Sequence, residues 1–197
     1  MNKNNNLKLD EIKSYINSKL NNKPIILVGM MGVGKSAIGK LLAKSLNKNF
    51  YDIDSAIEKT YNIKIHEIFE LYGEKKFREL EFREIKNIKK NCNLIISTGG
   101  GAFTFKNNYK IINEKGLTIW IKAEKNVIIK RVSKNINNRP LLKNKNLSNH
   151  INNLLKDRNP LYAKAHIHVE SLNETKIKMK NKLLVSINNY LKVFTND

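Results

Sequence analysis

The sequence of 197 residues has only one cysteine and no long apolar segment, and both features limit the classes of protein to which it can belong. A single cysteine, Cys92, excludes an internal disulfide and any metal site built from a cysteine cluster, which fits a reducing compartment. No apolar run approaches the roughly 18 residues that cross a bilayer, and the N-terminus lacks the apolar core of a signal peptide. We therefore expect a cytoplasmic protein with no membrane partner.

Arginine is also scarce. Of the 37 basic residues only five are arginine, namely Arg78, Arg83, Arg131, Arg139 and Arg158. Lysine supplies charge, but only arginine offers a planar fork that binds a carboxylate or phosphate through two parallel hydrogen bonds. Each arginine is therefore a candidate site residue. Arg83 is the exception, because its position in a charged helical stretch indicates a solvated face.

The formal net charge of +20 raises the question of a nucleic-acid partner, since clustered lysines bind phosphate backbones. Lysine and asparagine are spread over the whole chain, however, as a general compositional drift would spread them. We therefore expect no nucleic-acid partner. A nucleotide-dependent nucleic-acid-binding protein remains the alternative from another functional class.

Short apolar runs alternate with segments of helical periodicity. The apolar runs predict strands at residues 24–29, 49–54, 93–98, 117–123 and 165–170. Helices are predicted at residues 35–47, 55–90 with an interruption near Tyr72 and Gly73, 125–134, 148–158 and 174–194. This alternation predicts an α/β fold with a parallel sheet and helices on both faces.

Residues 1–23 precede this pattern as an N-terminal extension. Leu9, Ile12, Ile16 and Leu20 recur at helical spacing, which predicts a short amphipathic helix docked onto the domain of residues 24–197.

The strongest motif is "GMMGVGKS", which runs from Gly29 to Ser36 and follows a predicted strand. It matches the P-loop pattern, in which glycines let backbone N–H groups surround phosphates at the start of a helix. Lys35 would reach the β- and γ-phosphates of a nucleotide, and the Ser36 hydroxyl would bind Mg²⁺.

The second motif, "YDIDSAIE", places Asp52 and Asp54 at the end of a predicted strand, where alternation points both side chains to one face. Two carboxylates beside a phosphate site can hold Mg²⁺ through water and accept a proton from a hydroxyl group. Capping of the following helix by Asp54 or Ser55 explains the residues equally well on spacing alone.

Three further segments supply candidate site residues. Arg78 and Glu81 are three residues apart on a predicted helix, so the glutamate can hold an arginine aimed at a substrate carboxylate. The three glycines of "IISTGGGAF" permit close approach of a ligand to the backbone after a buried strand. Arg139 lies in a polar segment between helices, of the kind that closes over a nucleotide, and Arg158 follows a predicted helix.

Together these motifs resemble the shikimate kinase family over roughly residues 24–195. The resemblance implies a nucleoside-monophosphate-kinase-like P-loop fold, with three α/β/α layers around a five-stranded parallel sheet. It also implies shikimate-binding helices at about residues 54–90 and a mobile lid at about 135–148. Such an enzyme transfers the γ-phosphoryl of ATP to the 3-hydroxyl of shikimate with Mg²⁺ as cofactor, and we expect it to act as a monomer.

The resemblance also implies roles for individual residues. ATP would be bound by Gly32, Val33, Gly34, Lys35, Ser36, Ala37, Arg131 and Arg139. Shikimate would be bound by Asp54, Arg78, Gly99, Gly100, Gly101 and Arg158. Asp54 would act as the base, Lys35 and Arg139 would stabilise the transferring phosphoryl group, and Ser36 and Asp52 (through water) would hold the metal.

The nearest alternative within the same class is a kinase for another polyol acid, such as gluconate. Two arginines placed to bind a carboxylate, together with an intact Asp-x-Asp pair, favour shikimate.

Overall fold

A computed structural model of the chain describes residues 3–105, 108–133, 146–172 and 174–194. Its centre is a five-stranded parallel sheet, as expected, and the strands lie in the order β2-β3-β1-β4-β5. The strands are β1 (Ile25–Val28), β2 (Asn49–Asp52), β3 (Leu94–Ser97), β4 (Leu117–Lys122) and β5 (Ile167–Glu170).

Burial follows strand position. All four residues of the central strand β1 are buried, whereas the edge strand β2 is only partly covered. A strand buried on both faces needs apolar side chains throughout, which is why "IILV" lacks the alternation of a half-exposed strand.

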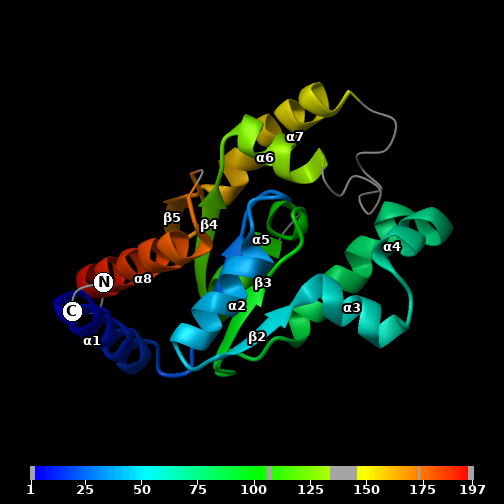
Figure 1. The fold of residues 1–197 in the computed structure, drawn as a ribbon. Coiled ribbons are helices and arrows are strands. Elements are labelled where there is room, and N and C mark those ends of the chain that lie inside the picture. The colour runs from blue at the N-terminus through cyan, green and yellow to red at the C-terminus, as the bar shows by residue number, and fades with distance from the viewer. Residues whose placement is uncertain (1–2, 106–107, 134–145, 173, 195–197) are drawn as a thin grey trace.

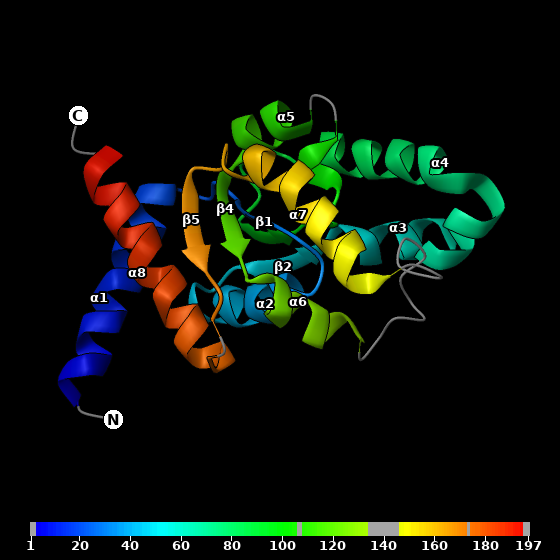
Figure 2. The same cartoon turned by 90° about the horizontal axis from the view of Figure 1, so that it is seen from above.

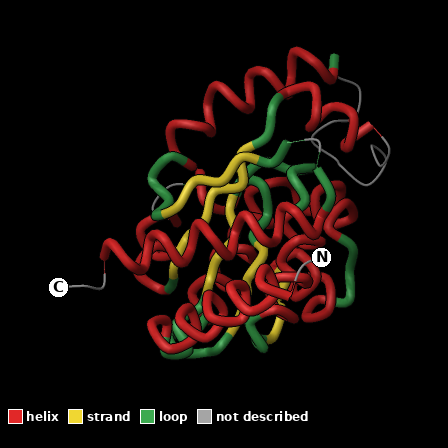
Figure 3. The backbone as a smooth tube through the Cα atoms, turned by 60° about the vertical axis from the view of Figure 1, so that its left-hand side comes forward, coloured by secondary structure: helices red, strands yellow, loops and turns green. Residues whose placement is uncertain are grey.

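Helices enclose the sheet on both sides (Figure 3). The described residues form α1 (Lys3–Leu20), α2 (Lys35–Ser45), α3 (Ile53–Tyr61), α4 (Ile65–Asn87), α5 (Asn108–Lys115), α6 (Lys125–Val132), α7 (Leu147–Tyr162) and α8 (Lys176–Phe194), with a 3₁₀ turn at Ala102–Thr104. Figure 2 shows α5 and α2 on opposite faces of the strands, so the layers are α/β/α. Helices α3 and α4 extend to one side, away from α1 and α8 (Figure 1). None of the helices within the described ranges is long and apolar enough to span a bilayer.

The structure corrects the ends of two predicted elements and adds one helix. The strand predicted over residues 49–54 ends at Asp52, because the Asp52 carboxylate caps the next helix by accepting the Ser55 N–H at 3.2 Å. The helix predicted over 148–158 continues to Tyr162. Pro160 removes only one backbone donor near the end of that helix, and the buried Tyr162 side chain anchors the last turn. Finally, α5 was not predicted at all.

The long helical stretch after the second strand divides into α3 and α4. Asn62, in the left-handed conformation, ends α3. Gly73 interrupts α4 with φ 75° and ψ 173°, as the sequence predicted near Tyr72 and Gly73. Such a φ value is strained for residues that carry a Cβ, so glycine suits the kink. The helix therefore restarts at Glu74 with a new direction.

Helix α1 packs against α8, and the two lie side by side in Figures 1 and 2. Ile16 and Leu20 are buried there, which follows from their helical spacing. Ile16 and Leu20 of the N-terminal extension thus belong to the hydrophobic core.

Ile16→Ala should lower the free energy of unfolding by about 2–5 kcal/mol, because it removes a fully buried side chain and leaves a cavity. Urea unfolding monitored by circular dichroism measures this change. Leu7→Ala in the same helix is the matched control, since Leu7 is 63% exposed and its truncation should change stability little. Equal effects of the two substitutions would contradict the docking of α1.

Candidate active site

The carboxyl ends of β1, β2 and β3 lie together at one edge of the sheet, and a cavity of about 580 Å³ opens above them. Ligands bind at this edge in open α/β sheets. The predicted site residues that line the cavity are Gly32, Gly34, Lys35, Ser36, Ala37, Asp52, Asp54, Arg78, Gly99, Gly100, Gly101, Arg131 and Arg158. Segments far apart in the sequence are thus brought to one place.

The loop between β1 and α2 has the shape that its glycines predict. Gly34 has φ 99°, a left-handed conformation that favours glycine, and α2 begins at Lys35 directly after it. The Lys35 ammonium group donates to the carbonyl oxygens of Gly29 and Met30 at 2.7 and 2.9 Å. The helix N-terminus and this ammonium group place positive charge at the cavity, which suits a phosphate.

Ser36 and Asp52 come together beside the loop. The Ser36 hydroxyl donates to Asp52 Oδ2 at 2.6 Å and lies 3.2 Å from the Ser97 hydroxyl. Hard oxygen donors of this kind suit Mg²⁺, which commonly takes few protein ligands and keeps several waters. The described residues contain no cluster of three or more histidine, cysteine or acidic side chains that would bind a metal without a nucleotide.

Asp54 lies in the first turn of α3, not on the strand, so strand alternation is the wrong reason for its proximity to Asp52. Asp52, rather than Asp54 or Ser55, is the cap of that helix. The Asp54 side chain still faces the cavity, and among the described residues its Oδ1 atom is buried with no hydrogen-bond partner. Burial, followed by the negative charge of Asp52, raises the pKa of Asp54 to about 6. A raised pKa and a free oxygen suit a carboxylate that accepts a proton.

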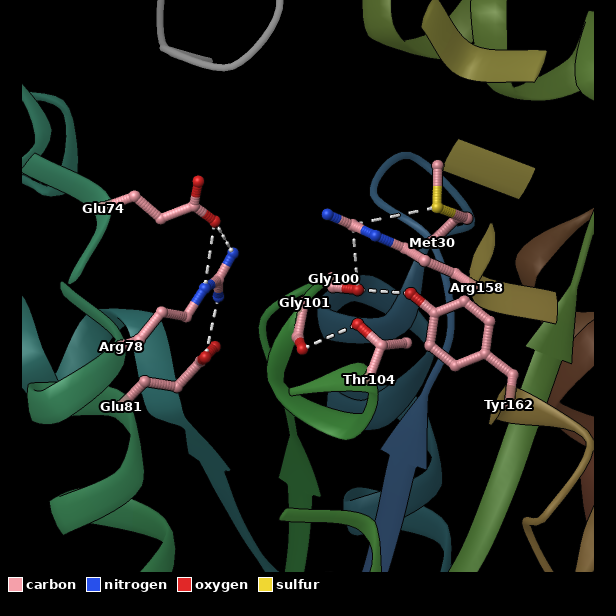
Figure 4. Close-up of polar contacts among 9 residues, drawn as sticks. All are labelled: Met30, Glu74, Arg78, Glu81, Gly100, Gly101, Thr104, Arg158 and Tyr162. Atoms are coloured by element: carbon pink, nitrogen blue, oxygen red, sulfur yellow. Dashed lines mark hydrogen bonds and ion pairs between the residues drawn. The ribbon is translucent and has the colours of Figure 1, made fainter. Parts of the chain in front are cut away.

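Arg78 is buried between two carboxylates. Its Nη1 donates to Glu81 Oε2 at 2.7 Å, while its Nε and Nη2 donate to Glu74 Oε1 at 3.2 and 2.9 Å. The predicted pairing with Glu81 is therefore present (Figure 4). Burial raises the pKa of Glu81 to about 7 despite the Arg78 charge, and the charge of Asp54 adds to the increase.

The three glycines separate Arg78 from Arg158. Figure 4 shows the two arginines on opposite sides of Gly100 and Gly101. A Cβ on Gly101 would come within 2.4 Å of Arg78 Nη2, so the absence of a side chain allows this close packing. Arg158 Nη1 donates to the Gly100 carbonyl oxygen at 3.2 Å. Two guanidinium groups and a stretch of bare backbone thus border one side of the cavity.

Arg131 joins the P-loop to the segment after β5. Its Nη1 donates to the Val33 carbonyl at 3.2 Å and to the Ser171 hydroxyl at 3.3 Å. The Val33 side chain is buried and does not line the cavity. Arg139 and most of the predicted lid lie outside the described residues.

Several cavity residues were not singled out from the sequence. Phe69 and Phe77 form an apolar wall with ring centroids 4.9 Å apart, and their recurrence on α4 with Ile65 was a usable signal. Lys176 also lines the cavity, at the start of α8. Glu74 lies four residues before Arg78 in α4, a helical spacing at which glutamate and arginine pair, so this contact could have been predicted.

A P-loop, an acidic pair and an anion-binding wall on a parallel sheet define a P-loop enzyme that transfers phosphoryl groups to small molecules. Comparison with known proteins then narrows the class. Residues 31–188 match the family model described as "SKI: Shikimate kinase". The chain belongs to the shikimate kinase family and is therefore an ATP-dependent kinase.

Curated relatives agree with this assignment. The shikimate kinase of Bartonella henselae is 40% identical over 96% of this chain and 90% of its own length. Shikimate kinase from Rhizobium meliloti is 38% identical over 88% of this chain and 90% of its own length.

Solved structures agree as well. Shikimate kinase from Acinetobacter baumannii in complex with shikimate gives a TM-score of 0.82 at 30% identity, over 92% of this chain and 98% of that one. A gluconokinase from Sinorhizobium meliloti gives a TM-score of 0.54 at 12% identity, over 90% of this chain and 99% of that one, a likeness of fold alone.

The raised pKa of Asp54 can be tested by replacing its charged neighbour. In the wild type, NMR titration of the Asp54 carboxyl carbon should give a pKa of about 6. Asp52→Asn should lower this value, because it removes a negative charge that disfavours ionisation of Asp54. Glu67→Gln, which alters a carboxylate bound to the Lys64 N–H, is the control and should leave the Asp54 titration unchanged. An Asp54 pKa that stays the same in Asp52→Asn would contradict the coupling.

Proposed function

We propose that this chain transfers the γ-phosphoryl of ATP to the 3-hydroxyl of shikimate, giving shikimate 3-phosphate and ADP. The observation that carries the proposal is the pair Arg78 and Arg158, facing each other across Gly100 and Gly101 beside the P-loop. Two guanidinium groups suit a substrate with a carboxylate, because each can form charge-assisted hydrogen bonds with it. The apolar wall of Phe69 and Phe77 suits the ring of such a substrate.

Asp54 serves as the base in this proposal. Its buried carboxylate faces the cavity between the P-loop and the glycine segment, where a hydroxyl acceptor would lie. A pKa of about 6 leaves it ionised at neutral pH yet closer to the working pH than an ordinary aspartate. It therefore takes up the hydroxyl proton as the phosphoryl group is transferred, and activity should fall as the pH drops through about 6.

ATP would bind with its phosphates along residues 32–37, and Lys35 would move from the carbonyls of Gly29 and Met30 to the phosphates. Ser36 and Asp52 would hold Mg²⁺, the latter through water. When bound, the metal supplies positive charge that neutralises the phosphate oxygens during transfer. Catalysis then rests mainly on positioning and electrostatic stabilisation.

Two further arginines are proposed to contact ATP. Arg131, already tied to the P-loop and to Ser171, would lie near adenine. Arg139, in a segment predicted to close over the nucleotide, would bind the phosphates. We further propose that the enzyme works as a monomer in the cytoplasm, a reducing compartment that its single cysteine fits.

ADP formation with and without shikimate, at saturating Mg-ATP, tests the proposed reaction directly. Shikimate should stimulate ADP release strongly, while gluconate should not. Stimulation by gluconate would favour the rival sugar-acid kinase. Stimulation by RNA or DNA but not by shikimate would overturn the proposal in favour of a nucleic-acid-dependent ATPase.

Arg78→Lys should weaken shikimate binding by about tenfold or more while ATP binding changes little. Lysine keeps the charge but loses the planar fork and the contacts to Glu74 and Glu81 that fix it. Steady-state kinetics with each substrate varied in turn give the two KM values. Arg83→Lys is the matched control, since Arg83 is exposed on the same helix and has no assigned role. An unchanged KM for shikimate in Arg78→Lys would remove Arg78 from the site.

Arg139→Ala should lower kcat by about 10²-fold or more, because an arginine that binds the transferring phosphoryl group stabilises its charge in the transition state. Lys134→Ala, at the start of the same segment, serves as the control and should have a small effect. If turnover survives the loss of Arg139 intact, the proposed phosphate contact is wrong.

A further inference from the structure

The Gly100 carbonyl oxygen accepts hydrogen bonds from two side chains of one helix. Arg158 Nη1 donates to it at 3.2 Å, and the Tyr162 hydroxyl donates to it as well (Figure 4). The two residues are four apart on α7, so they project from the same face of the helix. The Tyr162 side chain is completely buried, and its ring lies near Phe103 and Trp120, with centroids 6.5 and 5.9 Å away.

The Tyr162 hydroxyl is suited to act as a permanent donor. Burial raises the pKa of Tyr162 to about 12, so the group stays protonated over the whole range in which an enzyme works. Arg158 is different, because it lines the cavity and is expected to bind the substrate carboxylate. When Arg158 turns its donors to the substrate, Tyr162 can still hold the Gly100 carbonyl.

The direction of the Gly100 carbonyl also determines the direction of the Gly101 N–H, which lies on the opposite side of the same peptide. In a planar trans peptide the Gly100 C=O and the Gly101 N–H point in opposite directions. The carbonyl points toward Arg158 and Tyr162, so the Gly101 N–H points away from α7, toward the side on which Arg78 lies. Within the described part of the chain, the Gly101 N–H donates to no other group.

The next peptide is held separately. The Gly101 carbonyl accepts from the Thr104 hydroxyl at 3.0 Å and from the backbone N–H groups of Thr104 and Phe105, both at 3.1 Å. Consecutive glycines would otherwise rotate freely. The peptide between Gly100 and Gly101 therefore depends on α7 for its orientation.

We propose that Tyr162 is a positioning residue for the substrate carboxylate, acting through the peptide between Gly100 and Gly101. It keeps the Gly101 N–H directed toward the side on which Arg78 lies, where this neutral donor completes the carboxylate site. The inference rests on the proposed function, since it needs a substrate with a carboxylate at this place. Tyr162 itself touches no reacting atom, because its side chain is fully buried and does not line the cavity.

Tyr162→Phe removes the hydroxyl and keeps the ring. The KM for shikimate should rise about tenfold, because the peptide loses a buried hydrogen bond that fixes it. The KM for ATP and kcat should stay within about twofold of the wild-type values. The matched control is Tyr51→Phe, which also removes a hydroxyl with a pKa raised to about 12, here one bonded to Glu84 at 2.8 Å, and lies outside the cavity lining. Thermal unfolding of both variants shows that they are folded.

A substrate analogue separates positioning from general damage. In shikimate with a hydroxymethyl group in place of the carboxylate, Tyr162→Phe and wild type should have nearly the same KM. If Tyr162→Phe leaves the KM for shikimate unchanged, or raises the KM for the analogue and for ATP equally, the inference is overturned. Wild-type enzyme that ignores shikimate altogether would instead refute the proposed function.

Should the phenylalanine variant not fold, 3,5-difluorotyrosine at position 162 gives the same test. This residue keeps the shape and, at low pH, the hydroxyl donor, but it ionises more readily than tyrosine. The KM for shikimate should then rise with pH in this variant more steeply than in the wild type. Parallel pH profiles would overturn the inference.

Discussion

The parallel arrangement of β1, β2 and β3 is the constraint on which the site depends. Parallel strands that lie side by side must end at the same edge of the sheet, so the segments that follow them meet there. The P-loop follows β1, the acidic pair begins at the last residue of β2, and the three glycines come after β3. The phosphate-binding loop, the proposed base and the glycine segment that faces the substrate therefore lie close together, and none of the connecting loops has to be long.

Burial of charge is the second feature of this edge. Arg78 and Glu81 are nearly inaccessible to solvent, and isolated charges in such a place would be strongly destabilising. Each is tolerated because the other lies 2.7 Å away, and Glu74 adds a further partner at the kink of α4. Burial, which disfavours charged groups, also raises the pKa values of Asp54 and Glu81 above the usual range for carboxylates.

Much of the fold and of the proposed site could be predicted from the sequence, because local sequence patterns indicate them. The β-branched run "IILV", the P-loop glycines and the periodicity of the helices predict the parallel sheet and the place of Lys35 and Ser36. The end of β2 could not be predicted as reliably, since Asp52 satisfies strand and cap patterns alike and only the hydrogen bond from Ser55 separates them. Tyr162 was missed for a different reason. Its role depends on a hydrogen bond to Gly100, a residue distant in the chain, and tertiary packing sets this contact.

The packing of α1 against α8 has a consequence for how the protein folds while it is being synthesised. Helix α1 leaves the ribosome before α8, the helix against which it packs. Contacts between such distant segments form late, because the intervening chain must first be closed into a loop. Until α8 has been synthesised, the apolar face of α1 that carries Ile16 and Leu20 lacks this partner and is open to binding by a chaperone.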